Sequence, residues 1–510
     1  MWCNRVVAAA CLMPLLVVVA AQAQTADLAD RIQAGDRGAA LALIAAGTDV
    51  NQMQPDGTTP LHWAAYRVDP ELVRTLLDRG ARADAVNRYG ASPLSEAVRV
   101  ANVALVAMLL EAGAEANVAN EDGQTALMLA ARTGDVAVAE LLVEFGADVN
   151  RREGFRDQSA VMWAAAQAHP AMTAFLVAQG ADLSVRARAN DWASQISSEP
   201  RVQYRPTGGL TPLLYAVRAG CQDCVTTMVE AGADIDRPNP DGMTPMMMAL
   251  DNGHPAIAMY LFERGANPHP WDWWGRTALY AAVNMRGGPD SRSGPRPPES
   301  LALITALLEA GVNPNAQLAF KEPSRGGRDN RFRDDLLTTG ATPLLRAAQT
   351  FDDDVVRALL AHGARVDLPN ASGVTPFMAA AGVGTRLGSS VLGLGPSERV
   401  VEQSLGTMDL LRAAGADVNA RITDVTSLTG RIARTNTMTD RQGQTALFSV
   451  AQAGRIPVVR YLLEHGADVH AVDDMGRTVI EVVEGSGGSR DDARVQEMVA
   501  LLKGAGVAGN

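Results

Sequence analysis

The chain has 510 residues, of which 47% are apolar, 20% are charged and only 5% are aromatic. That apolar fraction is typical of a folded protein and argues against disorder along the whole chain. The net charge of −12 argues against a general nucleic-acid binder, which needs a basic surface to contact phosphates. Four cysteines are too few for a scaffold of this size held together by disulfides.

The first 23 residues have the three zones of a secretory signal peptide. Arg5 gives a positive start, residues 6–20 form an apolar run, and residues 21–23 form an A-x-A cleavage site. The run is short for a membrane span, and no later stretch is long and apolar enough to cross a bilayer. An uncleaved anchor is the alternative. We therefore expect cleavage after Ala23 and a periplasmic or secreted mature chain.

One motif recurs through the rest of the chain with a period of 33 residues, interrupted only by insertions. Each copy opens with a threonine or serine, which is followed in the clearest copy by Pro60-Leu61-His62. The second half of each copy has a leucine pair and then a glycine, as in Leu76-Leu77 and Gly80. The eleven opening residues are Thr59, Ser92, Thr125, Ser159, Thr211, Thr244, Thr277, Thr342, Thr375, Thr445 and Thr478.

The residue types of one copy predict two short helices and a turn. Threonine is a favoured N-cap, proline is tolerated at the first helical position, and glycine ends a helix by adopting a positive φ. Pairs such as Asp56-Gly57 favour the tight turn to the next copy. One copy cannot bury its own apolar face, so the core forms by stacking and the terminal copies must be atypical.

These motifs resemble the ankyrin repeat family. The T-P-L-H-x-A opening is matched by residues 59–64, and the G-A-D-V-N ending by residues 146–150 and 415–419. The resemblance implies an all-α solenoid of about twelve helix-turn-helix units with short β-turn fingers and several inserted loops. It replaces the three or four domains that the length alone would suggest with one elongated domain.

The predicted organisation follows from the positions of the motifs. It is a signal peptide at 1–23, an N-terminal capping repeat at 24–55, ankyrin repeats at 56–189, 210–316 and 341–420, inserted fingers at 190–209, 317–340 and 421–440, and repeats with a C-terminal cap at 441–510. Two further insertions, at 286–300 and 382–403, fall between the two helices of a pair. In the family, fingers and first helices line the concave face that binds partners. The alternative is that the insertions are tolerated decoration, because surface loops absorb length at little cost.

A regular finger at 269–275 contains Trp271, Trp273 and Trp274, three of the seven tryptophans of the chain. Aromatic and arginine side chains dominate the binding energy of many interfaces. We therefore interpret these tryptophans as partner-binding residues, together with five residues of the neighbouring enlarged fingers: Trp192, Tyr204, Arg331, Phe332 and Arg333. The alternative is a satellite core that covers the inserted fingers. Trp63 and Trp163 occupy a first-helix position that is often leucine in the family, and we interpret them as packing residues.

Cys221 and Cys224 are spaced C-x-x-C at the start of a second helix, where two positions three apart can reach disulfide geometry. In an exported chain this predicts a structural disulfide. A redox-active pair and a buried free cysteine are the alternatives.

The motifs of catalysis and metal binding that we sought do not occur: the sequence has no nucleophile elbow, no P-loop and no zinc-type spacing. We expect no catalytic residue, metal or cofactor. The sequence predicts a monomeric exported scaffold that is not an enzyme, binds a protein partner of unknown identity through the concave face, and binds no nucleic acid. The alternatives are an enzyme with its active site in the inserted loops and a structural spacer of the cell envelope.

Overall fold

The computed structural model describes residues 27–190, 207–287, 296–319, 339–383, 398–423, 441–485 and 493–508. The helices within these ranges form twelve antiparallel pairs, and the one two-stranded sheet described there is a ribbon of two residues on each side. The expected all-α repeat architecture is therefore confirmed. The chain divides into two compact units, residues 1–155 and 156–510. The predicted signal peptide at 1–23 lies outside the described residues.

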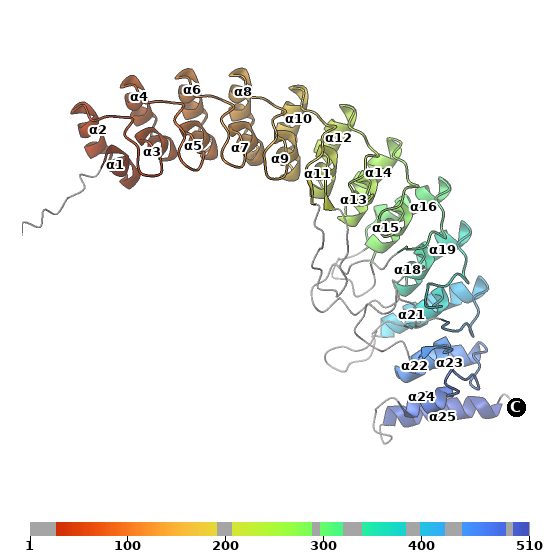
Figure 1. Cartoon of the computed structure of the whole chain (residues 1–510). Coiled ribbons are helices and arrows are strands. Elements are labelled where there is room, and N and C mark those ends of the chain that lie inside the picture. The colour runs from red at the N-terminus through yellow and green to blue at the C-terminus, as the bar shows by residue number, and fades with distance from the viewer. Residues whose placement is uncertain are drawn as a thin grey trace, which may run out of the picture. The chain divides into compact units, whose positions relative to one another are not determined.

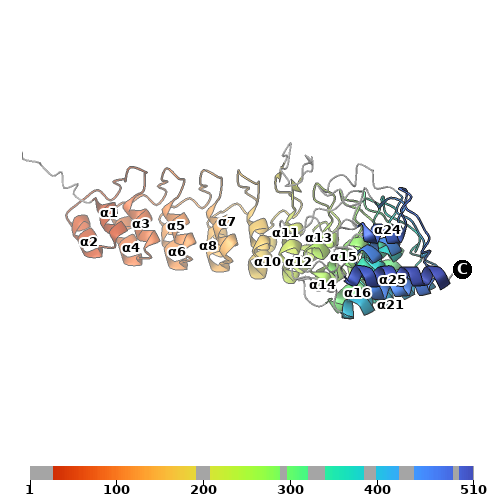
Figure 2. The same cartoon turned by 90° about the horizontal axis from the view of Figure 1, so that it is seen from below.

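The first unit contains four helix pairs in two rows (Figure 1). Each first helix contacts the first helix of the next pair, and each second helix contacts the next second helix. The turns that join one pair to the next project to the same side of this unit (Figure 2). The pairs are α1 Leu28–Ala34 with α2 Arg37–Ala45, α3 Pro60–Tyr66 with α4 Pro70–Asp78, α5 Pro93–Arg99 with α6 Val103–Glu111, and α7 Ala126–Thr133 with α8 Val136–Glu144.

The second unit contains eight pairs built in the same way. Its first helices contact one another in sequence order from α9 to α24. The pairs are α9 Ala160–Ala166 with α10 Pro170–Ala178, α11 Pro212–Ala219 with α12 Gln222–Glu230, α13 Pro245–Asp251 with α14 Pro255–Glu263, α15 Ala278–Met285 with α16 Pro298–Glu309, α18 Pro343–Gln349 with α19 Asp353–Ala361, α20 Pro376–Ala381 with α21 Glu398–Ala413, α22 Ala446–Gln452 with α23 Ile456–Glu464, and α24 Val479–Glu484 with α25 Ala493–Ala508.

The helix ends have the caps that the sequence predicts. All eleven opening threonines and serines are N-caps of first helices. Thr211 is an example, because its hydroxyl accepts a hydrogen bond from the Leu214 amide at 3.2 Å. Gly80, which follows α4, has a φ of 83°. The predicted N-cap positions and helix stops are confirmed, although the hydroxyls of Ser159 and Thr445 form no cap hydrogen bond.

Small and aliphatic side chains form the core of both units. On α3, Leu61, Ala64 and Ala65 are completely buried, and the leucines of the second helices close the other side. The alanines allow first helices to approach closely, so few aromatic rings are needed to fill the space between them. This packing accounts for the low aromatic content of the chain.

Several fingers are tight turns that form a backbone hydrogen bond with the neighbouring finger. In the finger after α4, the Asn87 side chain accepts hydrogen bonds from the Tyr89 and Ala91 amides, and the Arg88 amide donates to the Asp56 carbonyl at 2.7 Å. Gly90 has a φ of 72°, and a Cβ there would lie 2.5 Å from the Cα of Asn120 in the following finger. Glycine is thus required at position 90 for two reasons: the positive φ of its backbone and the close approach of the next finger.

The three enlarged fingers of the second unit have similar bases, in which backbone hydrogen bonds join the two ends of the insertion. The first base is the antiparallel pair of β1 Ala189–Asn190 with β2 Thr207–Gly208. In the other two, the Leu318 amide donates to Ala341 and the Ile422 amide donates to Gln444. The tips at 191–206, 320–338 and 424–440 lie outside the described residues, and so do Trp192, Tyr204, Arg331, Phe332 and Arg333.

The insertions inside helix pairs differ from the sequence prediction at their C-terminal ends. Helix α21 begins at Glu398, so residues 398–403 are helical, although the sequence places them in an inserted loop. The added turn is stabilised by packing, because Val400 is buried and the Ser404 hydroxyl donates to the Ala380 carbonyl at 2.7 Å. Helix α16 likewise begins at Pro298, inside the predicted insertion at 286–300.

A buried ion cluster fixes both ends of the 286–300 insertion. The Arg286 guanidinium donates to the two carboxylate oxygens of Asp352 at 2.6 and 3.2 Å, and to the Ser300 hydroxyl at 2.9 Å. Arg296 lies 3.4 Å from the same carboxylate. Asp352 precedes α19, so the described ends of the insertion are attached to the next helix pair.

Candidate binding surface

The tryptophan finger, defined here as residues 267–277, joins α14 to α15 and is held by buried charges. The Asp272 carboxylate accepts hydrogen bonds from the amides of Trp274 and Arg276 at 3.0 and 2.9 Å. The Arg276 guanidinium lies 2.6 Å from Asp272 and 2.9 Å from Asp251 at the end of α13. These contacts fix the backbone of the finger against the first helices.

The three tryptophans of this finger have different environments. Trp271 is 71% exposed and Trp273 is 42% exposed, so both can contact a partner. Trp274 is only 3% exposed, which corrects its interpretation as a partner-binding residue. A buried ring stabilises the finger by packing, and the alternative of a satellite core applies to Trp274 alone.

Backbone hydrogen bonds join the tryptophan finger to the fingers on both sides. The Trp273 amide donates to the Asp241 carbonyl at 2.8 Å, and the Ala319 amide donates to the Trp274 carbonyl at 2.8 Å. Ala319 belongs to the base of the enlarged finger at 317–340. The exposed tryptophans therefore lie on a surface formed by three neighbouring fingers that backbone hydrogen bonds link together.

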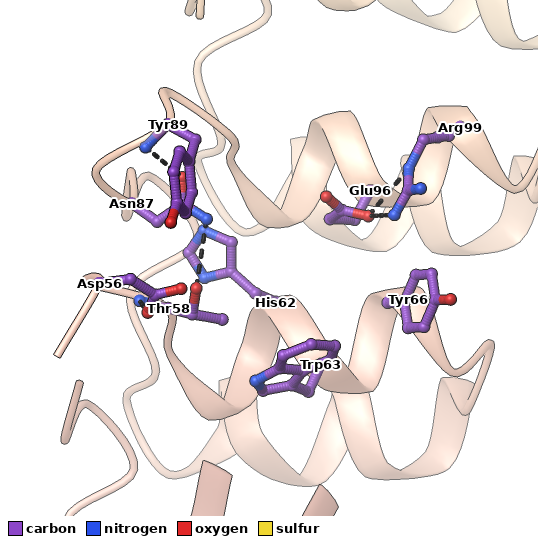
Figure 3. A pocket seen from close by; sticks show the side chains of 9 residues that line it. All are labelled: Asp56, Thr58, His62, Trp63, Tyr66, Asn87, Tyr89, Glu96 and Arg99. Carbon is purple, nitrogen blue, oxygen red and sulfur yellow. Dashed lines mark hydrogen bonds and ion pairs between the residues drawn. The ribbon is translucent and has the colours of Figure 1, made fainter. Parts of the chain in front are cut away.

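A second candidate site is a pocket of about 340 Å³ in the first unit, shown in Figure 3. Its walls come from α3, from α5 and from the two fingers that precede these helices. The Asn87 side chain donates to the Thr58 hydroxyl at 3.2 Å, which joins the two fingers at one end of the pocket.

Three aromatic side chains line this pocket: Trp63, Tyr66 and Tyr89. The rings of Trp63 and Tyr66 meet edge to face, with centroids 5.8 Å apart. Trp63 is half-buried and its indole NH donates to Gln54 at 2.8 Å. Its interpretation as a packing residue therefore holds only in part, because one side of the ring lines the pocket.

Sequence reasoning missed this pocket. Tyr66 follows Trp63 by three positions, a spacing that places both on one face of a helix, and this signal was present in the sequence. Tyr89 comes from the next copy of the repeat, and nothing in its local sequence connects it to Trp63.

His62 forms the base of the pocket and is almost completely buried. Its Nδ1 lies 2.8 Å from the Thr59 hydroxyl, and its Nε2 lies 2.9 Å from the Ala91 carbonyl in the next finger. Burial lowers the pKa of His62 below its ordinary value of 6.5, since the charged imidazolium is poorly solvated there. His62 therefore connects two repeats in its neutral form.

This lowered pKa predicts that acid weakens the first unit. Between the folded-state pKa and 6.5, the unfolded chain binds a proton that folded His62 does not, so stability is full above 6.5 and falls as the pH drops through this window. We expect the urea midpoint of the wild type to fall between pH 7 and pH 5, and to fall less in His62→Gln. Equal pH dependence in both proteins would contradict this account.

Cys221 and Cys224 are joined at the start of α12, with their Sγ atoms 1.97 Å apart. Cys221 is the N-cap, and its Sγ accepts a hydrogen bond from the Cys224 amide at 3.3 Å. Cys224 is completely buried against α10, where the Thr173 hydroxyl lies 3.6 Å from its sulfur. This environment suits a structural role for the pair.

We predict that these two cysteines are oxidised in the protein isolated from its native compartment. Under denaturing conditions, iodoacetamide should leave the peptide of residues 221–224 unmodified, and should add two carbamidomethyl groups after reduction. Mass spectrometry of the digest reads both states. Full alkylation without reductant would show that the thiols are free.

The described residues contain no group of three or more His, Cys, Asp or Glu side chains arranged to hold a metal ion. No helix in the described ranges is long and apolar enough to cross a membrane. The described surface does offer exposed aromatic rings on fixed fingers and an aromatic pocket.

Comparison with protein families identifies the repeat. Models of ankyrin repeats match residues 31–120 and 102–187 as groups of three copies, 213–261 as part of a many-copy array, and 339–371 and 442–474 as single repeats. Together these matches cover just over half of the chain. The chain belongs to the ankyrin-repeat proteins.

Curated relatives share the repeats over part of their length. The B-cell lymphoma 3 protein homolog of Mus musculus is 34% identical over 90 residues, 18% of this chain and 20% of the relative. The 2-5A-dependent ribonuclease of Homo sapiens is 29% identical over 206 residues, 39% of this chain and 27% of the relative. Protein phosphatase 1 regulatory subunit 27 of Mus musculus is 42% identical over 59 residues, 12% of this chain and 38% of the relative. The chain thus spans less than two fifths of the length of each.

Proposed function

We propose that this protein is an exported, non-catalytic scaffold that binds a protein partner through the face made by its fingers and first helices. The ankyrin repeats support a protein-binding role, as does the similarity to a phosphatase regulatory subunit. The observation that carries the proposal is the pair of exposed rings, Trp271 and Trp273, on a finger fixed by buried ion pairs.

Two physical effects favour binding through these rings: the apolar area that they bury and the small conformational entropy that the finger loses. An exposed tryptophan offers a large apolar surface, and burying it against a partner releases ordered water. The contacts of Asp272 with Arg276 already hold the finger in place, so the finger loses little additional conformational entropy when a partner binds. Rings presented in this way are typical of the few residues that dominate interface energies.

Binding should therefore depend on these two side chains. We expect the double substitution Trp271→Ala, Trp273→Ala to lower the affinity for the native partner at least tenfold, with an unchanged circular dichroism spectrum. Phe145→Ala is a matched control, since Phe145 is an exposed aromatic residue at the end of second helix α8. Quantitative co-purification from the native host measures both variants. Unchanged recovery of the partner by the double variant would refute this choice of site.

Export is the second part of the proposal, and it rests on the three-zone pattern of residues 1–23. The mature chain should begin at Gln24 and occur in the periplasmic or extracellular fraction. N-terminal sequencing of the fractionated protein tests this. A chain that keeps residues 1–23 and stays in the cytoplasm would exclude export.

A further inference from the structure

We propose that the pocket between α3 and α5 receives one basic side chain, a lysine or an arginine, of the protein partner. This inference rests on the proposed function and deepens it, because it assigns the chemistry of one contact on the same type of surface. The pocket lies in the first unit, apart along the sequence from the tryptophan finger.

The size of the pocket favours a side chain over a larger ligand. Its volume of about 340 Å³ is at the lower end of the range for small-molecule sites, roughly 300 to 1,000 Å³. Tyr89 is 65% exposed and Tyr66 is 42% exposed, so the walls remain partly in water when the pocket is empty. A side chain that arrives on the surface of a partner would fill the pocket while the partner covers these rings.

The aromatic walls favour a cation. The faces of aromatic rings carry negative electrostatic potential and attract ammonium and guanidinium groups. The protein already shows this interaction at one wall, where the Arg99 guanidinium lies 5.0 Å from the centroid of the Tyr66 ring. Trp63 and Tyr89 offer two further rings of the same pocket (Figure 3).

The charges of the pocket also favour a cation. Two carboxylates, Asp56 and Glu96, line it together with a single guanidinium, that of Arg99. Arg99 forms an ion pair with Glu96, whereas Asp56 forms no ion pair with any of the described residues. His62 adds no positive charge at neutral pH, because burial lowers its pKa. The residues that line the pocket therefore carry a net negative charge, located at Asp56. The hydrogen bond from the Thr58 amide and the charge of Arg88, which does not line the pocket, lower the pKa of this carboxylate and keep it ionised.

Asp56 also allows a clean test of this charge. Its Oδ1 accepts a hydrogen bond from the Thr58 amide at 2.9 Å, and an asparagine oxygen can accept the same bond. Asp56→Asn thus removes the charge and keeps the turn. Asp84→Asn is the matched control, since Asp84 is a carboxylate of the same unit that pairs with Arg82 and does not line the pocket.

The experiment uses the whole chain labelled with 5-fluorotryptophan. The Trp63 resonance is assigned by its loss in Trp63→Phe, and the probes are the Nα-acetyl methylamides of lysine, arginine and norleucine. We expect lysine and arginine to shift the Trp63 resonance with dissociation constants in roughly the millimolar range, and norleucine, which lacks the charge, to leave it in place. Asp56→Asn should weaken the basic probes about tenfold, and Asp84→Asn should leave their binding unchanged.

Three results would overturn the inference. The first is an equal shift with norleucine, and the second is unchanged binding of lysine and arginine to Asp56→Asn. The third is a free quaternary ammonium ion such as tetramethylammonium binding at least 100-fold more tightly than either amino acid, which would assign the pocket to a small molecule.

The native partner separates this inference from the proposed function. Weaker capture by Asp56→Asn, with normal capture by Asp84→Asn, would support the pocket assignment. Capture that needs Trp271 and Trp273 but not Asp56 would reject the pocket assignment and leave the scaffold function intact. If the basic probes shift the Trp63 resonance but the wild-type chain captures no partner, the scaffold function is rejected. A partner side chain is then also rejected as the occupant of the pocket.

Discussion

Replacing Asp352 with alanine should destabilise the second unit by about 3 to 5 kcal/mol, the usual cost of leaving a buried charge without its partner. The charge left behind is the Arg286 guanidinium, whose side chain is 5% exposed and which donates to Asp352 at 2.6 and 3.2 Å. Water cannot easily replace the lost carboxylate at such a site. The Arg296 contact to the same carboxylate would also be lost.

Urea unfolding followed by circular dichroism measures this effect. The control is Asp354→Ala, which removes an exposed carboxylate two residues away that pairs with Arg357 at 3.2 Å. Surface pairs contribute little, so this variant should change stability by less than about 1 kcal/mol. The double variant Arg286→Met, Asp352→Leu should recover much of the loss because it leaves no fully buried charge unpaired: Arg296, the other partner of Asp352, is 28% exposed and keeps its hydrogen bond to the Thr350 carbonyl. Equal stability of the two aspartate variants would show that the buried cluster is not needed.

Replacing Arg276 with methionine should cost about 3 kcal/mol and should also weaken partner binding. The Asp272 carboxylate is buried, and Arg276 supplies the positive charge 2.6 Å from it. Without that charge, Asp272 would become protonated or move toward water, and either change disturbs the amides of Trp274 and Arg276 that it holds. We therefore expect the exposed tryptophans to lose their fixed position.

The chain contains a matched control for this substitution. Asp473 and Arg477 repeat the same spacing in a later finger, with 2.8 Å between carboxylate and guanidinium. Both carboxylates are buried, with side-chain exposures of 0% for Asp473 and 1% for Asp272. The Arg477 side chain, however, is 34% exposed, compared with 7% for Arg276, so removing Arg477 opens Asp473 to water. Arg477→Met should cost about 1 kcal/mol and leave partner binding unchanged. Equal losses in both variants would show that burial does not decide the effect.

The helices and their ends could be predicted from the sequence because their causes are local. A threonine caps the helix that starts at the next residue, and a glycine with a positive φ just after the last turn ends a helix. Thr211 and Gly80 do so in the structure. The number of copies along the chain then gives the number of helix pairs. These pairs stack because one copy cannot bury its own apolar face.

The start of α21 was misplaced because aligning the repeats assigned residues 398–403 to an insertion. The segment itself contains good helix formers, namely Glu398, Arg399, Glu402 and Gln403. Packing on α20 adds to this local preference, because Val400 is buried and the Ala380 carbonyl accepts a hydrogen bond from Ser404 in the next turn.

The binding surface was predicted only in part, because the burial of a side chain depends on the repeats that pack next to it. The sequence drew attention to the tryptophan finger, but Trp271, Trp273 and Trp274 have equivalent sequence signals and differ only in burial. In the pocket, Trp63 and Tyr89 come from consecutive repeats, and only the stacking of these repeats brings both rings to one pocket.

The sequence by itself determined the family, the repeat period, the helix caps and the acidic net charge. These properties depend on residue type and on groups within a few positions along the chain. Only the tertiary structure decided that Asp352 pairs with Arg286, 66 residues away, that Trp274 is buried while Trp271 is exposed, and that three rings surround a pocket beside Asp56. Burial and long-range pairing depend on which repeats lie next to each other and on how closely they pack, and no single copy of the motif contains that information.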